Sequence, residues 1–193
     1  MRAGLLKSIR ESKNITNAVI LTHNIDFIFL QTVVLSELRR CGHPRLTIFA
    51  DAQCALSTYG QQAPLLDSLG SRFRVVPVVM EPGFRFHPKA LLLSGQEKAT
   101  LFVGSGNLTF GGWRENGEVW TRFDSETDGP ASLYAFRDYL NVITQATPLR
   151  ESIVAEVEEA FDGKTRAWAA SPAAPRGLLP RMRVGDDLIA QMK

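Results

Sequence analysis

The stretch FHPKALLLSGQEKATLFVGSGNLTFGGWRENGEVW, from Phe86 to Trp120, indicates how the centre of this chain folds. Two short apolar runs, residues 91–93 and 99–103, flank a turn that contains Gly95. Apolar runs of this length on either side of a glycine turn are typical of paired strands. The stretch therefore predicts a β-hairpin, and every other element is placed relative to it.

Polar side chains gather at the ends of this hairpin. His87 and Lys89 stand at the head of the first strand. Because alternate residues of an extended chain project the same way, the imidazole and the ammonium are expected to point into one site. A glycine-bracketed turn after the second strand can aim backbone N–H groups and side chains at an anion. That turn consists of Gly104, Ser105, Gly106 and Asn107.

These residue types suit chemistry at a phosphodiester. An imidazole can attack phosphorus or protonate a leaving oxygen, while a lysine and an amide hold the non-bridging oxygens as negative charge develops. Glu118 begins a third strand that is expected over residues 118–123. Its carboxylate can accept the second N–H of the His87 ring and fix the tautomer of that ring.

His87-x-Lys89, the glycine-bracketed turn and Glu118 together resemble the HKD motif of the phospholipase D superfamily, in particular its single-motif nuclease branch. The resemblance implies that His87 is the nucleophile that becomes a phosphohistidine, or the general acid that faces a second such site. It implies that Lys89 and Asn107 bind the phosphate oxygens, that Ser105 supports them, and that Glu118 orients His87. Gly104 and Gly106 are candidate substrate-binding residues in the same turn.

The chain departs from the family motif at one position. The family has an aspartate five residues after the lysine, and here that position is Ser94. In the family this aspartate is mainly structural, and some single-motif nucleases lack it. The resemblance therefore implies that the reacting groups remain, although the motif match is weaker.

The histidine count bears on assembly. The chain has His23, His43 and His87, and only His87 is followed by a lysine two residues later. The family mechanism uses two sets facing one phosphate, so the resemblance implies that the second set comes from another subunit or from another part of a longer protein. A two-fold homodimer satisfies this, because its interface repeats the same patch on both sides.

Composition limits the class of protein. With 193 residues, 45% hydrophobic and 22% charged, the chain is expected to form a globular domain of ordinary size. A net charge of +2 permits a nucleic-acid partner without arguing for one. Cys41 and Cys54 form neither a CxxC pair nor a disulfide framework and fit a reducing compartment. Without a secretion signal or a long apolar run, a cytoplasmic protein with no membrane contact is expected.

The residues before the hairpin predict a strand, helix, strand unit. A short helix is expected over residues 5–12, a buried strand over 15–22, a helix over 27–40 capped by Asn24 or Asp26, and a strand over 45–50. This spacing implies a right-handed parallel crossover. Residues 52–70 are interpreted as an irregular segment with a short helix near 63–69, and residues 73–80 as a strand in which Pro77 indicates an edge.

The residues after the hairpin predict mainly helices. Residues 108–114 are expected to form a tight loop whose Trp113 packs inward. Helices are expected over residues 130–145 and over 147–161, the second with Pro148 in its first turn.

The predicted fold class is α/β: a mixed, largely parallel β-sheet flanked by helices, as in a phospholipase D-like fold. Residues 1–163 are assigned to this catalytic domain, 164–181 to an Ala/Pro-rich linker or arm, and 182–193 to a C-terminal segment that can begin a further region. His23 and Asp51, at the carboxyl ends of two predicted strands, are expected to line the cleft.

The favoured function is a metal-independent nuclease without a cofactor, which cleaves DNA or RNA in a restriction or anti-phage system and is controlled by a regulatory partner or a further domain. Three alternatives stay open. One is a phospholipid phosphodiesterase, although the sequence has no amphipathic basic helix. Another is a module that binds phosphate or nucleic acid without turnover. The weakest is a metallohydrolase that uses His23, Asp26, Asp51 and His87, which lack a metal-binding spacing.

Overall fold

The computed structural model describes residues 4–66, 73–128, 130–162 and 164–170. Its centre is a six-stranded sheet in the order β3-β2-β1-β4-β5-β6. The strands are β1 (Ile15–Thr22), β2 (Arg45–Asp51), β3 (Phe73–Val78), β4 (Ala90–Gly95), β5 (Ala99–Gly104) and β6 (Trp120–Asp124). Glu118 therefore lies just before β6, whereas the sequence predicted that it begins this strand.

The sheet is mixed. β1 is parallel to β2 and β2 to β3, whereas β4 pairs antiparallel with β1, β5 with β4, and β6 with β5. The predicted hairpin, the parallel crossover and the edge position of the strand with Pro77 are all confirmed. β4, which directly follows His87 and Lys89, lies between β1 and β5 in the middle of the sheet. Both of its edges are therefore hydrogen-bonded to neighbouring strands.

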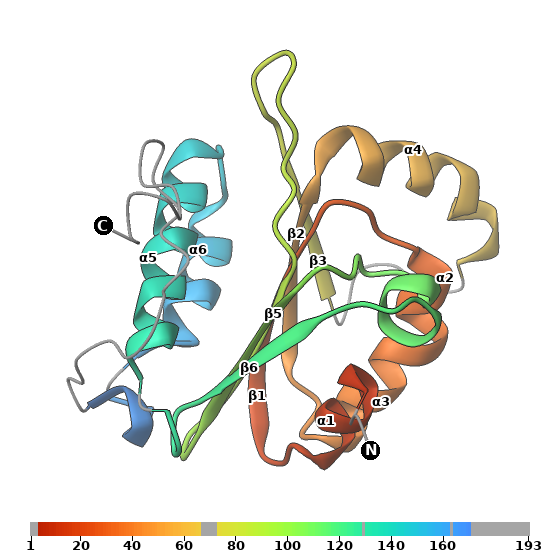
Figure 1. The fold of residues 1–193 in the computed structure, drawn as a ribbon. Coiled ribbons are helices and arrows are strands. Elements are labelled where there is room, and N and C mark those ends of the chain that lie inside the picture. Colours follow the sequence, from red (N-terminus) through yellow and green to blue (C-terminus); the bar gives the residue numbers. More distant parts are fainter. Residues whose placement is uncertain (1–3, 67–72, 129, 163, 171–193) are drawn as a thin grey trace, which may run out of the picture.

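Helices cover both faces of the sheet, as Figure 1 shows. One side holds α1 (Leu5–Glu11), α4 (Ala52–Gln62) and one continuous helix formed by α2 (Phe27–Phe29), the π-helical segment η1 (Leu30–Val34) and α3 (Leu35–Arg40). The other side holds α5 (Ala131–Ala146) and α6 (Glu151–Glu159). Short turns of helix complete the description: η2 (Ala63–Leu65), η3 (Gly111–Glu115) and η4 (Ala167–Ala170).

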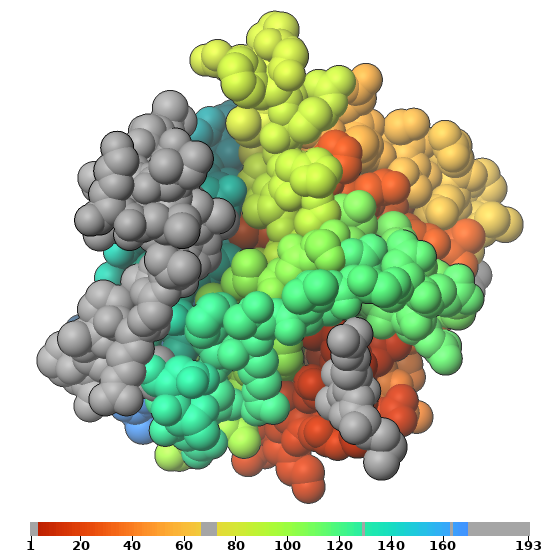
Figure 2. All heavy atoms as spheres, viewed as in Figure 1, coloured from red at the N-terminus to blue at the C-terminus, as the bar shows by residue number. Residues whose placement is uncertain are grey.

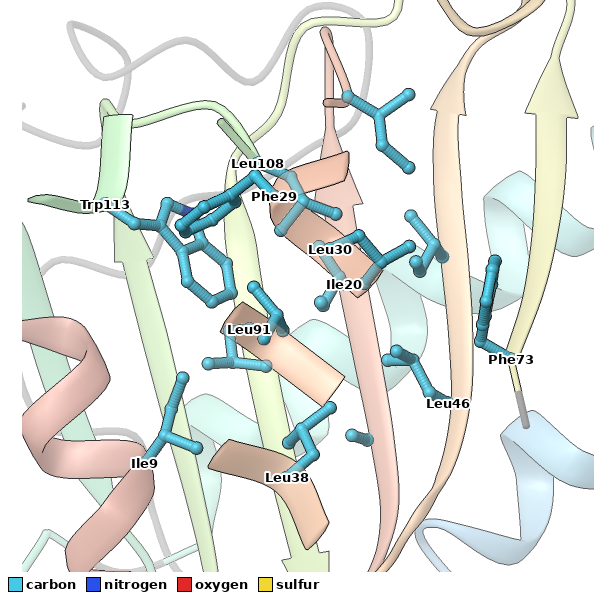
Figure 3. Packing of buried hydrophobic residues seen from close by; sticks show 14 of the residues in the cluster. Ile9, Ile20, Phe29, Leu30, Leu38, Leu46, Phe73, Leu91, Leu108 and Trp113 are labelled. Carbon is cyan, nitrogen blue, oxygen red and sulfur yellow. The ribbon is translucent and has the colours of Figure 1, made fainter. Parts of the chain in front are cut away.

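The hydrophobic core follows the alternation of the strands. Ile20 and Leu91 pack on the face covered by α2 and α3, together with Leu30 and Trp113 (Figure 3). Their strand neighbours point to the face covered by α5 and α6, where they meet residues such as Phe136. Trp113 is 6% exposed, which confirms its inward packing. Burial on both faces explains why these strands consist of almost continuous apolar runs.

The segment after β2 is not irregular, contrary to the sequence interpretation of residues 52–70. It begins with α4, and the Asp51 side chain caps this helix by accepting the backbone N–H groups of Gln53 and Cys54 at 3.1 Å each. Capping by aspartate offsets a sequence with few apolar positions at helical spacing. Of the short helix expected near 63–69, η2 covers the beginning, and residues 67–69 lie outside the described residues.

The second C-terminal helix begins later than predicted. Thr147 is the extended residue that ends α5, and α6 starts only at Glu151. The residue before a proline avoids the helical conformation, so Thr147-Pro148 forms part of the connection instead of a helix start.

The boundary predicted at residue 163 is wrong for the residues that follow it directly. Arg166 and Trp168 are 3% and 7% exposed. The Arg166 guanidinium donates to Thr16 Oγ1 and Asn17 Oδ1 of β1 at 2.6 Å each, and the Trp168 indole donates to the Gly95 carbonyl of β4 at 3.1 Å. The packed domain therefore continues past 163. Residues 171–181 of the predicted linker and the segment 182–193 lie outside the described residues.

The connection between β3 and β4 stands out from the body of the molecule (Figures 1 and 2). It carries three exposed hydrophobic side chains, Val79, Met80 and Phe84, and turns at Gly83, whose φ is +90°. It leads directly into His87. No helix of the described residues has both the length and the apolar character needed to span a membrane.

Candidate active site

His87 and Lys89 meet at the start of β4. The Lys89 ammonium lies 2.6 Å from Nδ1 and 3.2 Å from Nε2 of the His87 ring, and it donates to the His87 carbonyl at 2.9 Å. The His87 side chain is exposed, whereas Lys89 is only 7% exposed. The structure thus brings the two groups together as the i, i+2 spacing predicts.

The surroundings of His87 favour the neutral form of its ring. Partial desolvation lowers the pKa of His87, and the neighbouring Lys89 and His23 side chains lower it further. Burial also lowers the pKa of Lys89, although the charge of Glu118 opposes this. A neutral imidazole keeps the lone pair that a nucleophile needs.

The backbone before His87 is fixed on both sides. The Phe86 N–H donates to Asp51 Oδ2 at 3.0 Å, and the Phe86 carbonyl lies 3.1 Å from His23 Nδ1. The Phe86 ring is buried in the core. Asp51 and His23 therefore hold the peptide that leads into His87.

His23 also lies against His87 directly. The centroids of the two imidazole rings are 4.6 Å apart, with 37° between their planes. On the other side of His23, its Nε2 lies 3.5 Å from Cys54 Sγ. Burial tends to raise the pKa of Asp51, but hydrogen bonds from Cys54 N and Phe86 N, with the charge of His23, bring it below its usual range.

The Asn107 turn is joined to the end of β1. The Leu108 N–H donates to Thr22 Oγ1 at 2.9 Å, and the Asn24 N–H donates to Asn107 Oδ1 at 3.2 Å. Because the amide oxygen accepts this bond, the Asn107 NH₂ group is the part of the side chain that can donate to an anion. The turn is thus brought beside His23, although 83 residues separate Asn24 from Asn107.

The two glycines of the turn are required for packing. A Cβ at Gly104 would lie 2.4 Å from the Val119 carbonyl oxygen and 2.6 Å from the Trp120 ring, and one at Gly106 would lie 2.1 Å from the Gly112 carbonyl oxygen. No real side chain tolerates such contacts. These glycines let the turn pack closely on η3 and β6.

Ser105 and Glu118 form a pair at the rim of the site. The Ser105 hydroxyl donates to Glu118 Oε2, and the Asn116 amide donates to Glu118 Oε1 at 3.3 Å. These hydrogen bonds, with a smaller effect of Lys89, lower the pKa of Glu118. Among the described residues the hydrogen bonds of Glu118 do not include one with His87, so the expected tautomer-fixing contact is absent from this conformation.

Ser94, which replaces the family aspartate, is fully buried at the opposite end of β4. Its hydroxyl donates to the Ala160 carbonyl at 2.7 Å and so joins β4 to the end of α6. A carboxylate here would face a carbonyl oxygen. The position is structural in this chain, in keeping with the role that the resemblance implies.

One hollow is lined by His87, and a second is lined by Cys54, the neighbour of His23. An apolar cavity of about 190 Å³ lies between His87, Lys89 and α5, and Phe136 forms part of its wall. A more open polar groove of about 410 Å³ is lined by Asn24, Gln53, Cys54, Ser57, Thr58 and Arg85.

The metal-ligand set proposed from sequence is not assembled. Asp26 caps α2 through Ile28 N and Phe29 N and accepts from Gln62, away from Asp51. The described residues instead place Cys54 with His23 and Asp51. The sequence interpretation did not include Cys54 in the site because it did not predict α4. It did not include Phe86 because this residue contacts Asp51 and His23 through backbone atoms, which do not depend on residue type.

These elements define a phospholipase D-like fold, with the motif residues at the start of its central hairpin. NucT from Helicobacter pylori has a similar structure, with a TM-score of 0.51 and 15% identity over 74% of this chain and 86% of that chain. A mutant of yeast tyrosyl-DNA phosphodiesterase 1 also matches, with a TM-score of 0.51 and 19% identity over 80% of this chain.

The comparisons confirm the predicted resemblance at the level of the fold. This chain corresponds to only 37% of the yeast phosphodiesterase chain. No family model and no curated protein sequence matches it.

Proposed function

We propose that this protein is a metal-independent phosphodiesterase that cleaves nucleic acid with His87 as the nucleophile. The observation that carries the proposal is the contact of the His87 imidazole with the Lys89 ammonium at the wall of the apolar cavity. The ring supplies a lone pair and the lysine supplies charge for the phosphate oxygens.

Each motif residue has a role in this proposal. His87 attacks phosphorus, the leaving oxygen departs with a proton, and water then hydrolyses the phosphohistidine. Lys89 moves from the His87 ring to a non-bridging oxygen, and the Asn107 NH₂ group binds another. Glu118 holds Ser105 at the rim, and its charge opposes the lowering of the Lys89 pKa by burial.

A nucleic acid fits the site better than a lipid does. The groove beside His23 is lined by amide, hydroxyl and guanidinium groups, which suit a sugar-phosphate chain. A protein named for its action on tyrosyl-DNA shares the fold. Both observations support a nucleic-acid substrate.

The proton for the leaving oxygen comes from a second copy of the chain. In-line displacement places the attacking and leaving atoms on opposite sides of phosphorus. Rings whose centroids are 4.6 Å apart leave no room for phosphorus between them, so His23 cannot face His87 across the phosphate. A two-fold dimer that brings His87 of each subunit to one phosphate would supply the acid.

The test is cleavage of labelled single- and double-stranded DNA and RNA in excess EDTA, with the mass of the protein in solution measured in parallel. We expect cutting by a dimer, a loss of at least about 10³-fold in His87→Asn, and, after acid-free quenching, a His87 peptide joined through phosphorus to the nucleic-acid fragment that has not left. His43→Asn is the matched control, because His43 is exposed at a turn with φ of +60° and should be dispensable.

Two outcomes would contradict the proposal. Equal activity in the wild type and His87→Asn would exclude the nucleophile. A folded dimer that binds nucleic acid without cutting any of the substrates would favour a binding module.

A further inference from the structure

Three metal-ligating side chains gather beside His87. His23 follows β1, Asp51 ends β2 and Cys54 lies in the first turn of α4. One ligand atom from each lies within 4.8 Å of the other two, and Cys54 Sγ is 3.5 Å from His23 Nε2. A thiolate, an imidazole and a carboxylate form a ligand set that suits Zn²⁺.

The ligands are already oriented for a metal. The Phe86 carbonyl lies 3.1 Å from His23 Nδ1 and accepts the N–H of that nitrogen, which leaves the Nε2 lone pair on the side of Cys54. The N–H of the same residue donates to Asp51 Oδ2. Metal-binding histidines and carboxylates usually have such partners, which fix the tautomer and the direction of the lone pairs.

The cluster is open to solvent through the polar groove. Cys54 forms part of the groove wall, next to Asn24, Ser57 and Arg85. A hydrated cation can therefore reach the sulfur without any rearrangement of the fold, and an entry path is a requirement for a metal site.

The position of a fourth ligand is also defined. Three protein ligands leave one vertex of a tetrahedron free. The exposed His87 ring, 4.6 Å from the His23 ring, is the candidate for that vertex. Coordination by His87 would occupy the lone pair that attack on phosphorus needs.

We propose that His23, Asp51 and Cys54 form a binding site for Zn²⁺, that His87 completes it, and that the bound ion inhibits the enzyme. Binding replaces the Cys54 thiol proton, which passes to solvent, and no electron is transferred. The inhibition rests on the proposed phosphodiesterase function, whereas the binding of the metal does not.

The binding test uses the full chain after removal of metals, with Co²⁺ as a coloured substitute for Zn²⁺. We expect one Co²⁺ per chain, with a thiolate-to-cobalt charge-transfer band and the intense visible absorption of a tetrahedral ion. Cys54→Ser should lose the charge-transfer band and bind Zn²⁺ at least about tenfold more weakly in competition with a chromogenic chelator.

Cys41→Ser is the matched control, since Cys41 is buried and its sulfur donates to the Leu38 carbonyl. It should keep the band. His23→Gln removes a different ligand and should lose the tetrahedral absorption, which keeps the test decisive if Cys54→Ser does not fold. A band that survives in folded Cys54→Ser, or no band in the wild type, would overturn the site.

The activity test separates the inhibition from the nuclease itself. Zn²⁺ should inhibit wild-type cleavage and EDTA should restore it, while folded Cys54→Ser, compared with its own rate in EDTA, should need at least about tenfold more Zn²⁺ for half-inhibition. Equal inhibition of both proteins would refute the inhibitory role. If the chain cleaves no phosphodiester at all, the proposed function fails, and the cobalt spectrum still decides whether the metal site exists.

Discussion

Asp51 accepts a 3.0 Å hydrogen bond from the backbone N–H of Phe86, the residue before the candidate nucleophile. The same carboxylate caps α4 through Gln53 N and Cys54 N. One buried side chain, 3% exposed, therefore joins the end of β2, the start of α4 and the segment that leads into β4. The geometry of the site and the stability of the fold depend on it together.

Asp51→Asn is expected to lower both the stability of the fold and the rate of cleavage. An amide presents an N–H where the carboxylate accepts one, so we expect a loss of about 2–3 kcal/mol in the free energy of unfolding and a cleavage rate lower by about 100-fold. Urea denaturation and cleavage in EDTA measure the two. Asp26→Asn is the control, because Asp26 caps α2 in the same way without touching Phe86. Equal loss of activity in both variants would mean that Asp51 acts only through stability.

Gly106→Ala should disturb the Asn107 turn. Its Cβ would lie 2.1 Å from the backbone oxygen of Gly112, and backbone cannot move aside as a flexible side chain can. We expect a loss of about 1–3 kcal/mol in stability together with reduced substrate affinity. Gly117→Ala is the control, since a Cβ there meets nothing within 4 Å. Thermal denaturation that gives the same midpoint for both variants would contradict the packing role.

Ser94→Ala tests whether the position of the family aspartate is structural here. The change removes the hydrogen bond to the Ala160 carbonyl and leaves that buried oxygen without its donor. Stability should fall by about 1–2 kcal/mol, while cleavage by the folded protein stays at the wild-type rate. A catalytic loss in a fully folded variant would show that Ser94 acts on the site from the far end of β4.

Asp124 should make the fold sensitive to acid. It is 6% exposed, and hydrogen bonds from Arg122, Glu126 N and Thr100 hold the pKa of its carboxyl below the usual range despite its burial. A carboxyl whose pKa is lower in the folded state adds stability above its unfolded pKa, and that stability is lost as the pH falls through the folded pKa.

The difference in unfolding free energy between the wild type and Asp124→Asn should therefore be about 1–2 kcal/mol at pH 7. It should vanish as the pH drops below about 4. Urea denaturation across this range measures it, and Asp138→Asn, at an exposed position of α5, should show no such dependence. If this difference in unfolding free energy does not change with pH, the charge of Asp124 does not contribute to stability.

The order of the elements and the central hairpin follow from patterns within the sequence. Runs such as 91–93 and 99–103 alternate between the two cores, and the spacing of His87 and Lys89 gives their contact. Such signals are local, and they are therefore readable without a structure. The start of α4 is different, because it depends on a capping side chain rather than on apolar periodicity.

The parts of the site that could not be predicted rest on contacts between distant segments. Phe86 is held by Asp51, 35 positions before it, and by His23, 63 positions before it. Both contacts use backbone atoms of Phe86, which every residue type has. The Glu118 partners could not be chosen from sequence either, because Ser105, Asn116 and His87 all offer a suitable donor. Only the register of the folded strands selects among them.

The hydrogen bond from the Trp168 indole to the Gly95 carbonyl attaches η4 to the end of β4 that lies away from His87. Gly95 and the His87 end of β4 are separated by the length of the strand, about 17 Å. The Trp168 side chain is 7% exposed, so its contribution to fluorescence should report on unfolding of the domain and not on a polymer bound at His87.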